Sequence, residues 1–197
     1  MKTIGLCGGS GSGKGAVGKL FEMHGIPVID TDAVYHEITS GLSECLSELV
    51  SFFGESIIDD KGALDRGALG KIVFSQDAEQ KLAELNRITH KHILSNVRLK
   101  LSDIEASGIE YAVVDAPLLF ESGFNKECDV IVAVIADKNL RIERVMARDG
   151  ISRDAAVRRI SSQLSDEFLI ENSDFVIYNS ASLSELAEKI EILINEI

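Results

Sequence analysis

A glycine-rich segment near the start of the chain, Gly8-Gly9-Ser10-Gly11-Ser12-Gly13-Lys14, has the residue types and spacing of a phosphate-binding loop. Glycines let the backbone curl around a polyphosphate without Cβ clashes, so that successive N–H groups converge on the phosphate oxygens. A lysine at the end of the pattern reaches the β- and γ-phosphates of a nucleoside triphosphate. The segment therefore predicts ATP binding by residues 8–16, with a flexible glycine turn as the alternative.

The position after the lysine departs from the usual pattern. It normally carries Ser or Thr, whose hydroxyl binds Mg²⁺, whereas this chain has Gly15 followed by Ala16. One metal ligand is therefore missing. A nearby hydroxyl, on Ser10, Ser12 or Thr31, is a candidate substitute.

Carboxylates follow two of the apolar segments that look like strands. Asp30 and Asp32 come after the second segment and Asp115 after the third. In open α/β sheets the ligand crevice lies beyond the carboxyl ends of the strands, where a carboxylate can take a proton from a hydroxyl or hold Mg²⁺. We therefore expect Asp32 to be a catalytic base or metal ligand and Asp115 a metal ligand. Helix capping and turn formation are the alternatives, above all for Asp30.

A basic cluster stands out in an acidic protein. Residues 138–159 carry seven Lys or Arg and three acidic residues, although the whole chain has a net charge of −12. Arg141, Arg144 and Arg148 share one helical face at i, i+3 and i+7. Arginines that move over a polyphosphate would neutralise the charge of the transferred group. A solvated helix face is the alternative, especially for Arg141 and Arg153.

Three further observations limit the possible functions. His90 and His92, at i and i+2, do not share a helical face, so a shared metal is not expected. Asn179 follows the last apolar segment, where it would contact a nucleobase or form a turn. The cysteines, Cys7, Cys45 and Cys128, fit neither a zinc spacing nor a disulfide framework, which indicates reduced thiols.

The composition is that of a globular protein with a packed core. The chain has 197 residues, of which 45% are hydrophobic and only 2 are proline. Its acidity argues against nucleic-acid and acidic-membrane partners. We expect neither a signal peptide nor a membrane span, because the first apolar run breaks at Gly8 and no stretch approaches about 20 apolar residues. We therefore expect a cytoplasmic protein with small-molecule substrates, as a monomer or weak homo-oligomer.

Some segments are apolar throughout, without the alternation of polar and apolar residues that a half-exposed strand shows. Between them lie segments with helical periodicity. The expected strands are residues 3–7, 26–29, 111–114, 130–135 and 175–178, and the expected helices are residues 14–24, 33–40, 42–53, a long one capped by Asp77, 138–149, 153–163 and 183–197. Residues 62–70 are expected to be a turn-rich connector. This order predicts a doubly wound α/β fold with a parallel sheet and helices on both faces. About 80 mostly helical residues between the second and third strands exceed an ordinary crossover and indicate an inserted helical subdomain.

Taken in order, these segments resemble the dephospho-coenzyme A kinase family nearly end to end. The phosphate-loop pattern alone is widespread, but the Asp-x-Asp, the Pro-Leu-Leu-Phe-Glu segment and the Arg-x-x-x-Arg-Asp-Gly segment together are far more specific. The similar segments are residues 8–14, 28–32, 64–69, 72–75, 88–90, 117–121, 144–150, 163 and 176–179.

The resemblance implies a P-loop NTPase fold of the nucleoside-monophosphate-kinase type. It implies a core (about residues 1–31, 108–136 and 164–197), a helical substrate subdomain (about 32–107) and a lid (about 137–163). The reaction implied is transfer of the ATP γ-phosphoryl group to the ribose 3′-hydroxyl of dephospho-CoA, giving CoA and ADP, with Mg²⁺.

The resemblance also assigns roles to individual residues. Asp32 would activate or orient the acceptor hydroxyl, Lys14 would hold ATP, and Arg144 and Arg148 would be lid arginines. Asn179 would lie near the adenine of ATP. The residues implied in substrate binding are Asp30, Asp32, Arg66, His90, Pro117 and Leu118.

The chain departs from the family pattern at three places. Gly15-Ala16 replaces Ser-Thr, Cys7 stands where many members have Thr, and His90-Lys91 replaces His-Pro. Two alternative functions therefore stay open at this point. One is a kinase of the same fold that acts on another nucleotide or small alcohol. The other is a non-catalytic ATP-binding protein, which the missing hydroxyl at position 15 would favour.

Overall fold

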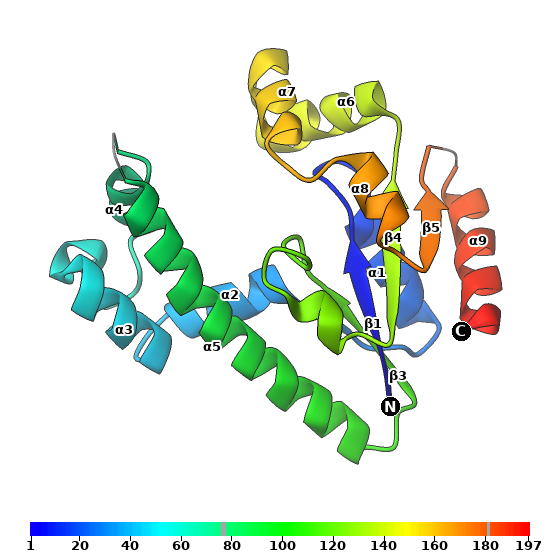
Figure 1. Cartoon of the computed structure of the whole chain (residues 1–197), viewed down its shortest axis with the longest axis horizontal. Helices are drawn as coiled ribbons and strands as arrows, with labels where there is room; N and C mark the ends of the chain where they lie inside the picture. Colours follow the sequence, from blue (N-terminus) through cyan, green and yellow to red (C-terminus); the bar gives the residue numbers. More distant parts are fainter. Residues whose placement is uncertain (76–77, 181) are drawn as a thin grey trace. The chain divides into compact units, whose positions relative to one another are not determined.

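A five-stranded parallel sheet forms the centre of the larger part of the chain (Figure 1). The computed structural model describes residues 1–75, 78–180 and 182–197. The strand order is β2-β3-β1-β4-β5. The strands are β1 (Lys2–Cys7), β2 (Val28–Asp30), β3 (Tyr111–Asp115), β4 (Val130–Ile135) and β5 (Phe175–Tyr178). The predicted parallel α/β sheet is therefore confirmed.

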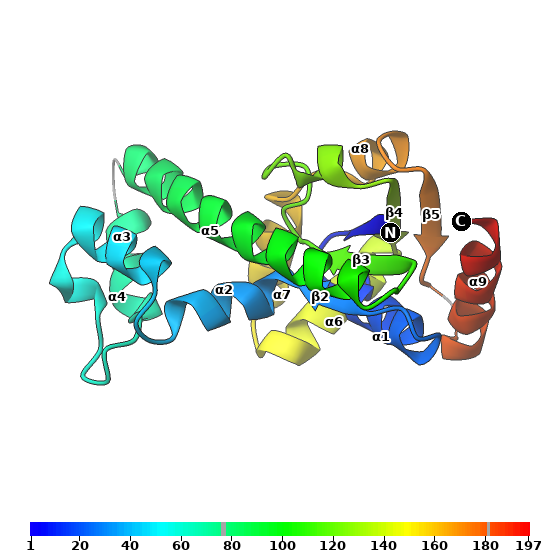
Figure 2. The ribbon, with the colours of Figure 1, turned by 90° about the horizontal axis from the view of Figure 1, so that it is seen from below.

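The strands are continuously apolar because both faces of the sheet are covered. Ile4 and Leu6 of β1 belong to a buried cluster that includes residues of α1 (Lys14–Met23) and α9 (Leu183–Glu196). Successive side chains of a strand alternate between its faces, so a side chain at position 5 would point to the face opposite Ile4 and Leu6. A Cβ there would lie 2.8 Å from the Cys128 sulfur, so this position has room only for glycine. Figure 2 shows α8 (Asp166–Glu171) and α1 on opposite sides of the sheet.

The other helices largely follow the apolar periodicity. They are α2 (Thr31–Thr39), α3 (Glu44–Phe53), α4 (Arg66–Val73), α5 (Glu79–Ala106), α6 (Lys138–Asp149) and α7 (Arg153–Ser161), with short 3₁₀ turns at Glu55–Ile57 and Phe124–Glu127. The prediction of a turn-rich connector over residues 62–70 is wrong from residue 66 onward. Asp65 accepts a hydrogen bond from the Ala68 N–H at 2.9 Å and thereby caps α4, while Leu69 and Val73 are buried. The predicted cap Asp77 lies outside the described residues.

The chain divides into two compact units. One comprises residues 1–29 and 103–197 and contains nearly all of the sheet; the other comprises residues 30–102 and is helical, with α2, α3, α4 and most of α5. The finer division into core, substrate subdomain and lid remains a prediction. Of the helices in the described part of the chain, none is long and apolar enough to span a membrane.

A small separate core joins α6 to α7. Ile142 and Val145 of α6 pack with Ala156 and Ile160 of α7, and all four are buried. Ile142 and Val145 lie outside the i, i+3 and i+7 positions of the α6 arginines. The helix pair therefore has its own hydrophobic support and presents its arginine-bearing face elsewhere.

Candidate active site

The glycine-rich loop connects β1 to the first turn of α1. Gly11 and Gly13 have φ values of +78° and +95°, and α1 begins at Lys14, directly after Gly13. The first amides of a helix have no intrahelical acceptor, and the helix dipole adds partial positive charge there. The loop therefore has the backbone form of an anion-binding site.

Close packing around the loop requires glycine as strictly as its dihedral angles do. A Cβ on Gly8 would lie 2.5 Å from the Val134 carbonyl oxygen, and one on Gly11 would lie 2.5 Å from the Arg141 carbonyl oxygen. A Cβ on Gly13 would overlap the side-chain nitrogen of Asn179. The spacing of the glycines thus reflects contacts with distant segments as well as the curl of the loop itself.

Two arginines of α6 hold the loop by its carbonyl oxygens. Arg141 donates from Nε to the Ser10 carbonyl at 3.0 Å and from NH1 to Asp166 at 2.6 Å, and its side chain is only 4% exposed. Arg144 donates to the Gly11 carbonyl at 3.1 Å and to the Asn179 carbonyl at 3.3 Å. The alternative of a solvated surface position is therefore wrong for Arg141.

Two amide side chains complete this support. Asn179 is buried and donates from Nδ2 to the Ser12 carbonyl at 2.8 Å. The Gln163 side-chain oxygen accepts a hydrogen bond from the Ser10 N–H at 2.8 Å. Asn179 thus holds the loop in place, and contact with the ATP adenine remains a prediction for it.

Lys14, the first residue of α1, lies beside Asp115, the last residue of β3. Asp115 is in register with Leu6 of β1, and its Oδ1 lies 3.8 Å from Lys14 Nζ. Both side chains are mostly buried, at 14% and 17% exposure. The Ser12 hydroxyl is also buried here and, within residues 1–75, 78–180 and 182–197, has no hydrogen-bond partner. A cation, a carboxylate and an unsatisfied hydroxyl are thus concentrated at the loop.

Position 15 is open. A Cβ built on Gly15 meets no atom within 4 Å, and the residue is exposed in the first turn of α1. A larger side chain therefore fits there without displacing its neighbours. The missing hydroxyl is a chemical difference and not a steric one.

Arg148 is directed to a different partner from Arg141 and Arg144. Its Nε and NH2 donate to the two Asp149 oxygens at 2.7 and 2.9 Å, and Asp149 also pairs with Arg159. These contacts raise the pKa of Arg148 and lower that of Asp149. The Arg148 side chain is 61% exposed and is not among the loop contacts of the described residues. Its predicted catalytic role remains a prediction.

In the helical unit, Asp30 and Asp32 occupy the start of α2. Asp30 accepts hydrogen bonds from the N–H groups of Asp32 at 2.8 Å and Ala33 at 3.3 Å, which is the capping role considered as an alternative. Asp32 is exposed in the first turn. Asp30 therefore caps the helix, and the catalytic role expected for Asp32 remains a prediction.

The same unit contains the other predicted substrate residues. Arg66 donates to the Thr39 hydroxyl at 2.9 Å and lies over the Tyr35 ring, 5.5 Å from its centroid. His90 is half-buried in α5. His92 instead contacts Glu48 of α3 at 2.7 Å.

Glu48 of α3 forms hydrogen bonds to three residues of α5. Its carboxylate accepts from Lys91 at 2.8 Å, His92 at 2.7 Å and Arg87 at 3.1 Å. These hydrogen bonds, led by those from Lys91 and His92, lower the Glu48 pKa to about 2. The packing of α3 against α5 therefore accounts for this group of charged residues around Glu48.

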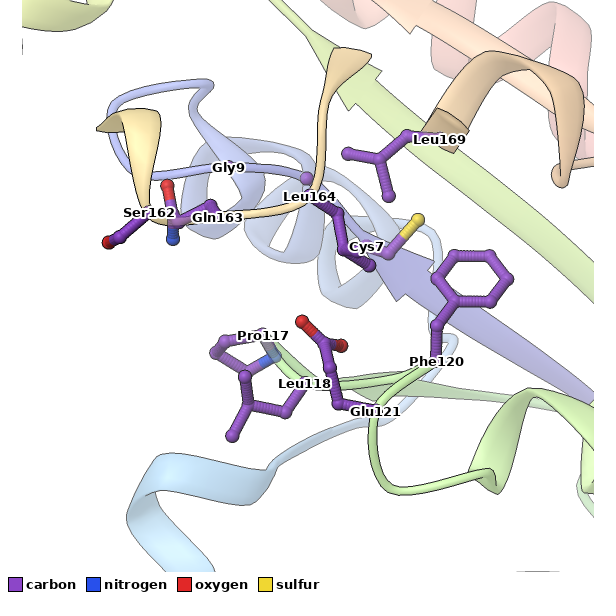
Figure 3. Close-up of a pocket in the computed structure, with 11 residues that line it drawn as sticks. Cys7, Gly9, Pro117, Leu118, Phe120, Glu121, Ser162, Gln163, Leu164 and Leu169 are labelled. Atoms are coloured by element: carbon purple, nitrogen blue, oxygen red, sulfur yellow. The ribbon is translucent and has the colours of Figure 1, made fainter. Parts of the chain in front are cut away.

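A pocket of about 220 Å³ opens beside the loop. Figure 3 shows Pro117, Leu118 and Glu121, which follow β3, on one side and Gln163 with Leu164 on another. Cys7 contributes its sulfur to the wall, and burial is the main reason that its pKa is raised to about 11. Two predicted substrate residues, Pro117 and Leu118, are thus adjacent to the glycine loop, while Glu121 was not singled out individually in the sequence.

Comparisons with known proteins agree with this arrangement. The family model for dephospho-CoA kinase matches residues 2–185. A dephospho-CoA kinase of Carboxydothermus hydrogenoformans is 37% identical over 96% of this chain and 91% of its own length. The crystal structure of TT1252 from Thermus thermophilus has a TM-score of 0.84 at 31% identity and covers 100% of this chain and 97% of that one. The structure of a dephospho-CoA kinase from Campylobacter jejuni has a TM-score of 0.72 at 26% identity, covering 100% and 97%. The chain therefore belongs to the dephospho-CoA kinase family.

Proposed function

We propose that this protein transfers the γ-phosphoryl group of ATP to the ribose 3′-hydroxyl of dephospho-CoA, the last step of coenzyme A biosynthesis. Family membership over nearly the whole chain is the observation that carries the proposal. The glycine loop, with its carbonyl oxygens held by Arg141 and Arg144, supports it because such a loop presents its amides to a polyphosphate.

Phosphoryl transfer needs alignment and charge neutralisation more than covalent help from the protein. Residues 8–16 hold the ATP phosphates, and Lys14 neutralises charge on the β- and γ-phosphates. Arg144 and Arg148 are the lid arginines, with Arg144 also fixing the loop. Asp32 accepts the proton of the acceptor hydroxyl or orients it, while Asp30, Arg66, His90, Pro117 and Leu118 bind the acceptor.

The residues present suit Mg²⁺ that arrives with ATP. Within the described residues there is no group of three or more His, Cys, Asp or Glu that would hold a metal alone. Mg²⁺ usually keeps several waters and binds one or two carboxylates together with substrate phosphates. Asp115, beside Lys14, supplies one such carboxylate, and Asp32 is the second candidate. Bound Mg²⁺ neutralises phosphate charge and fixes the triphosphate geometry.

The location and assembly are part of the same proposal. We infer a cytoplasmic enzyme that is a monomer or weak homo-oligomer and uses small-molecule substrates. The net charge of −12 supports the small-molecule part of this inference, because nucleic acid and acidic membranes would repel the protein.

An acceptor-panel assay tests the proposed activity. Purified protein with ATP and Mg²⁺ is given dephospho-CoA, adenosine, AMP or CMP, and ADP release is followed with a coupled enzyme system. Turnover is expected with dephospho-CoA well above the other acceptors, and mass spectrometry should identify CoA. Equal or faster turnover of another acceptor would instead indicate a different kinase of this fold. ATP binding without any turnover would indicate a non-catalytic protein.

Replacing Arg141 by alanine should weaken ATP binding through the loop. The change removes the hydrogen bond to the Ser10 carbonyl and leaves Asp166 without its buried cation. We expect calorimetry to give a Kd for ATP about tenfold higher or more, because one lost charged hydrogen bond is worth about 1.5–3 kcal/mol. A lower thermal unfolding temperature should accompany it.

The matched control for this variant is Arg153→Ala, which removes an exposed arginine bonded to Asn139. It should bind ATP like the parent. Equal ATP affinity in the Arg141 and Arg153 variants would show that the buried arginine does not support the loop.

Introducing serine at position 15 tests how the metal is held. Gly15→Ser should fold normally because no atom lies within 4 Å of the new Cβ. If the usual hydroxyl ligand is the only thing missing, the Mg²⁺ concentration for half-maximal activity should fall roughly threefold to tenfold. A change of this size corresponds to the free energy of about one added hydrogen bond. Gly15→Ala, which adds a methyl group and no hydroxyl, should behave like the parent. Superimposable Mg²⁺ titrations for the serine and alanine variants would contradict a metal role for this position.

A further inference from the structure

The pocket beside the glycine loop has the size of one ring system. Its volume of about 220 Å³ is below the roughly 300–1,000 Å³ of sites that take a whole small molecule. Gly8 and Gly9 form part of its wall, so an occupant would lie directly beside the phosphate-binding backbone. The pocket therefore suits one part of a larger ligand whose remainder extends outside it.

Its apolar walls suit a flat ring. Leu164, Leu169 and Phe120 line it, and Leu169 is buried. The Phe120 ring packs edge-to-face on Phe168 at a centroid distance of 5.2 Å, which holds its orientation. Aliphatic and aromatic side chains of this kind cover the faces of a planar heterocycle and leave its edge for polar groups.

Two polar side chains of opposite hydrogen-bonding character lie at the pocket. The Gln163 oxygen is engaged by the Ser10 N–H at 2.8 Å, so its NH₂ group is the end left to donate into the pocket. An ionised Glu121 carboxylate only accepts. Figure 3 shows the two side chains on facing sides of the pocket, with the Glu121 carboxylate directed inward. Glu121 is also near enough to Cys7 to act on its thiol electrostatically.

One donor and one acceptor together match the edge of adenine. Adenine presents its exocyclic amino group, a donor, next to a ring nitrogen, an acceptor. Hypoxanthine, which has a carbonyl oxygen in place of the amino group, would set an acceptor against a carboxylate. The polar pair thus discriminates between two purines of nearly the same shape.

The proposed function, which puts the ATP adenine near Asn179, assigns the two sides of the sheet to the two nucleotides. Pro117, Leu118 and Glu121 follow β3, whereas Asn179, the residue predicted near the ATP adenine, follows β5. In the strand order these ends lie on opposite sides of β1 and its glycine loop. The β3 side is therefore the side of the acceptor.

We propose that this pocket binds the adenine ring of the acceptor, with Glu121 accepting a hydrogen bond from the 6-amino group and Gln163 donating to the adjacent ring nitrogen. The inference rests on the proposed function, because it assumes an adenine-containing acceptor. Glu121 is then a specificity-determining residue, and its removal should act on acceptor binding while leaving ATP binding unchanged.

Steady-state kinetics with dephospho-CoA and its hypoxanthine analogue test this assignment. The parent should prefer dephospho-CoA about tenfold in kcat/KM, because the hypoxanthine carbonyl would face the Glu121 carboxylate without a donor between them. In Glu121→Gln and Glu121→Ala that preference should fall to about threefold or less, mainly through a higher KM for dephospho-CoA and with an unchanged KM for ATP. The control is Glu110→Gln, an exposed glutamate just before the opposite end of β3, which should keep the full preference.

The outcomes separate the assignment from the activity. Turnover of dephospho-CoA by a parent that treats both acceptors alike would overturn the adenine assignment and leave the kinase function intact. Absence of turnover with either would overturn the function, and calorimetric titration with dephospho-CoA would then decide the pocket by itself. Equal Kd values for the parent and Glu121→Ala would overturn the assignment, whereas a tenfold higher Kd in the variant would support it.

Discussion

Asp32→Asn is expected to lower kcat with dephospho-CoA by about 10²–10⁴-fold, the usual contribution of a positioned general base. Asparagine has nearly the same shape as aspartate but cannot take a proton from the acceptor hydroxyl. It also removes a negative charge that would favour Mg²⁺. The KM for ATP should change much less than kcat, because the phosphate-binding loop is untouched. The measurement is the coupled ADP-release assay at saturating ATP.

The choice of Asp32 depends on what Asp30 does. Asp30 caps α2 through the N–H groups of Asp32 and Ala33, so the fold already uses that carboxylate. The control is Asp60→Asn, an exposed aspartate of the same unit, which should retain full activity. An Asp32→Asn enzyme within threefold of the parent would remove Asp32 from the chemistry and direct attention to Asp30 or Asp115.

The sheet and the glycine loop could be predicted from sequence because their signals are local. Uninterrupted apolar runs such as Val130–Ile135 are typical of strands covered on both faces, and a run of glycines before Lys14 specifies a backbone curl. The start of α4 was missed because Gly67 and Gly70 suggested turns. The Asp65 cap and the burial of Leu69 outweigh those glycines.

The support of the loop could not be predicted because it is formed by long-range contacts. A solvated helix face was the alternative for Arg141, and the burial of its side chain depends on Ser10 at one end and Asp166 at the other. Asp166 belongs to α8, a helix too short to give a periodic signal, although Ser165 caps it. The only sequence signal was the i, i+3 spacing of Arg141 and Arg144, which places both on one helical face.

Replacing Lys14 by methionine should lower kcat/KM for ATP by about 10²–10³-fold, comparable to removing one preorganised donor at a developing charge. Methionine retains a long apolar side chain and loses only the ammonium group. The ammonium group is mostly buried and lies 3.8 Å from Asp115. A cation from the solvent therefore would not take its place in the variant. Lys14→Arg should not restore activity, since the wider, planar guanidinium does not match a compact ammonium at this position.

Lys19→Met is the matched control, because Lys19 lies on the same helix α1 and is exposed to solvent. It should retain parental kinetics, and circular dichroism should show both methionine variants folded.

The Lys14 variant also distinguishes whether the lysine acts through Asp115 or on the phosphates. If loss of Lys14 changes only the Mg²⁺ dependence through Asp115, excess Mg²⁺ will restore turnover; if Lys14 acts on the phosphates themselves, excess Mg²⁺ will not. We expect the second result, because Lys14 is the first residue of α1, directly after the glycine loop, where a helix N-terminus favours bound phosphate. A Lys14→Met enzyme that keeps more than a tenth of the parental kcat/KM would contradict the role of the loop in catalysis.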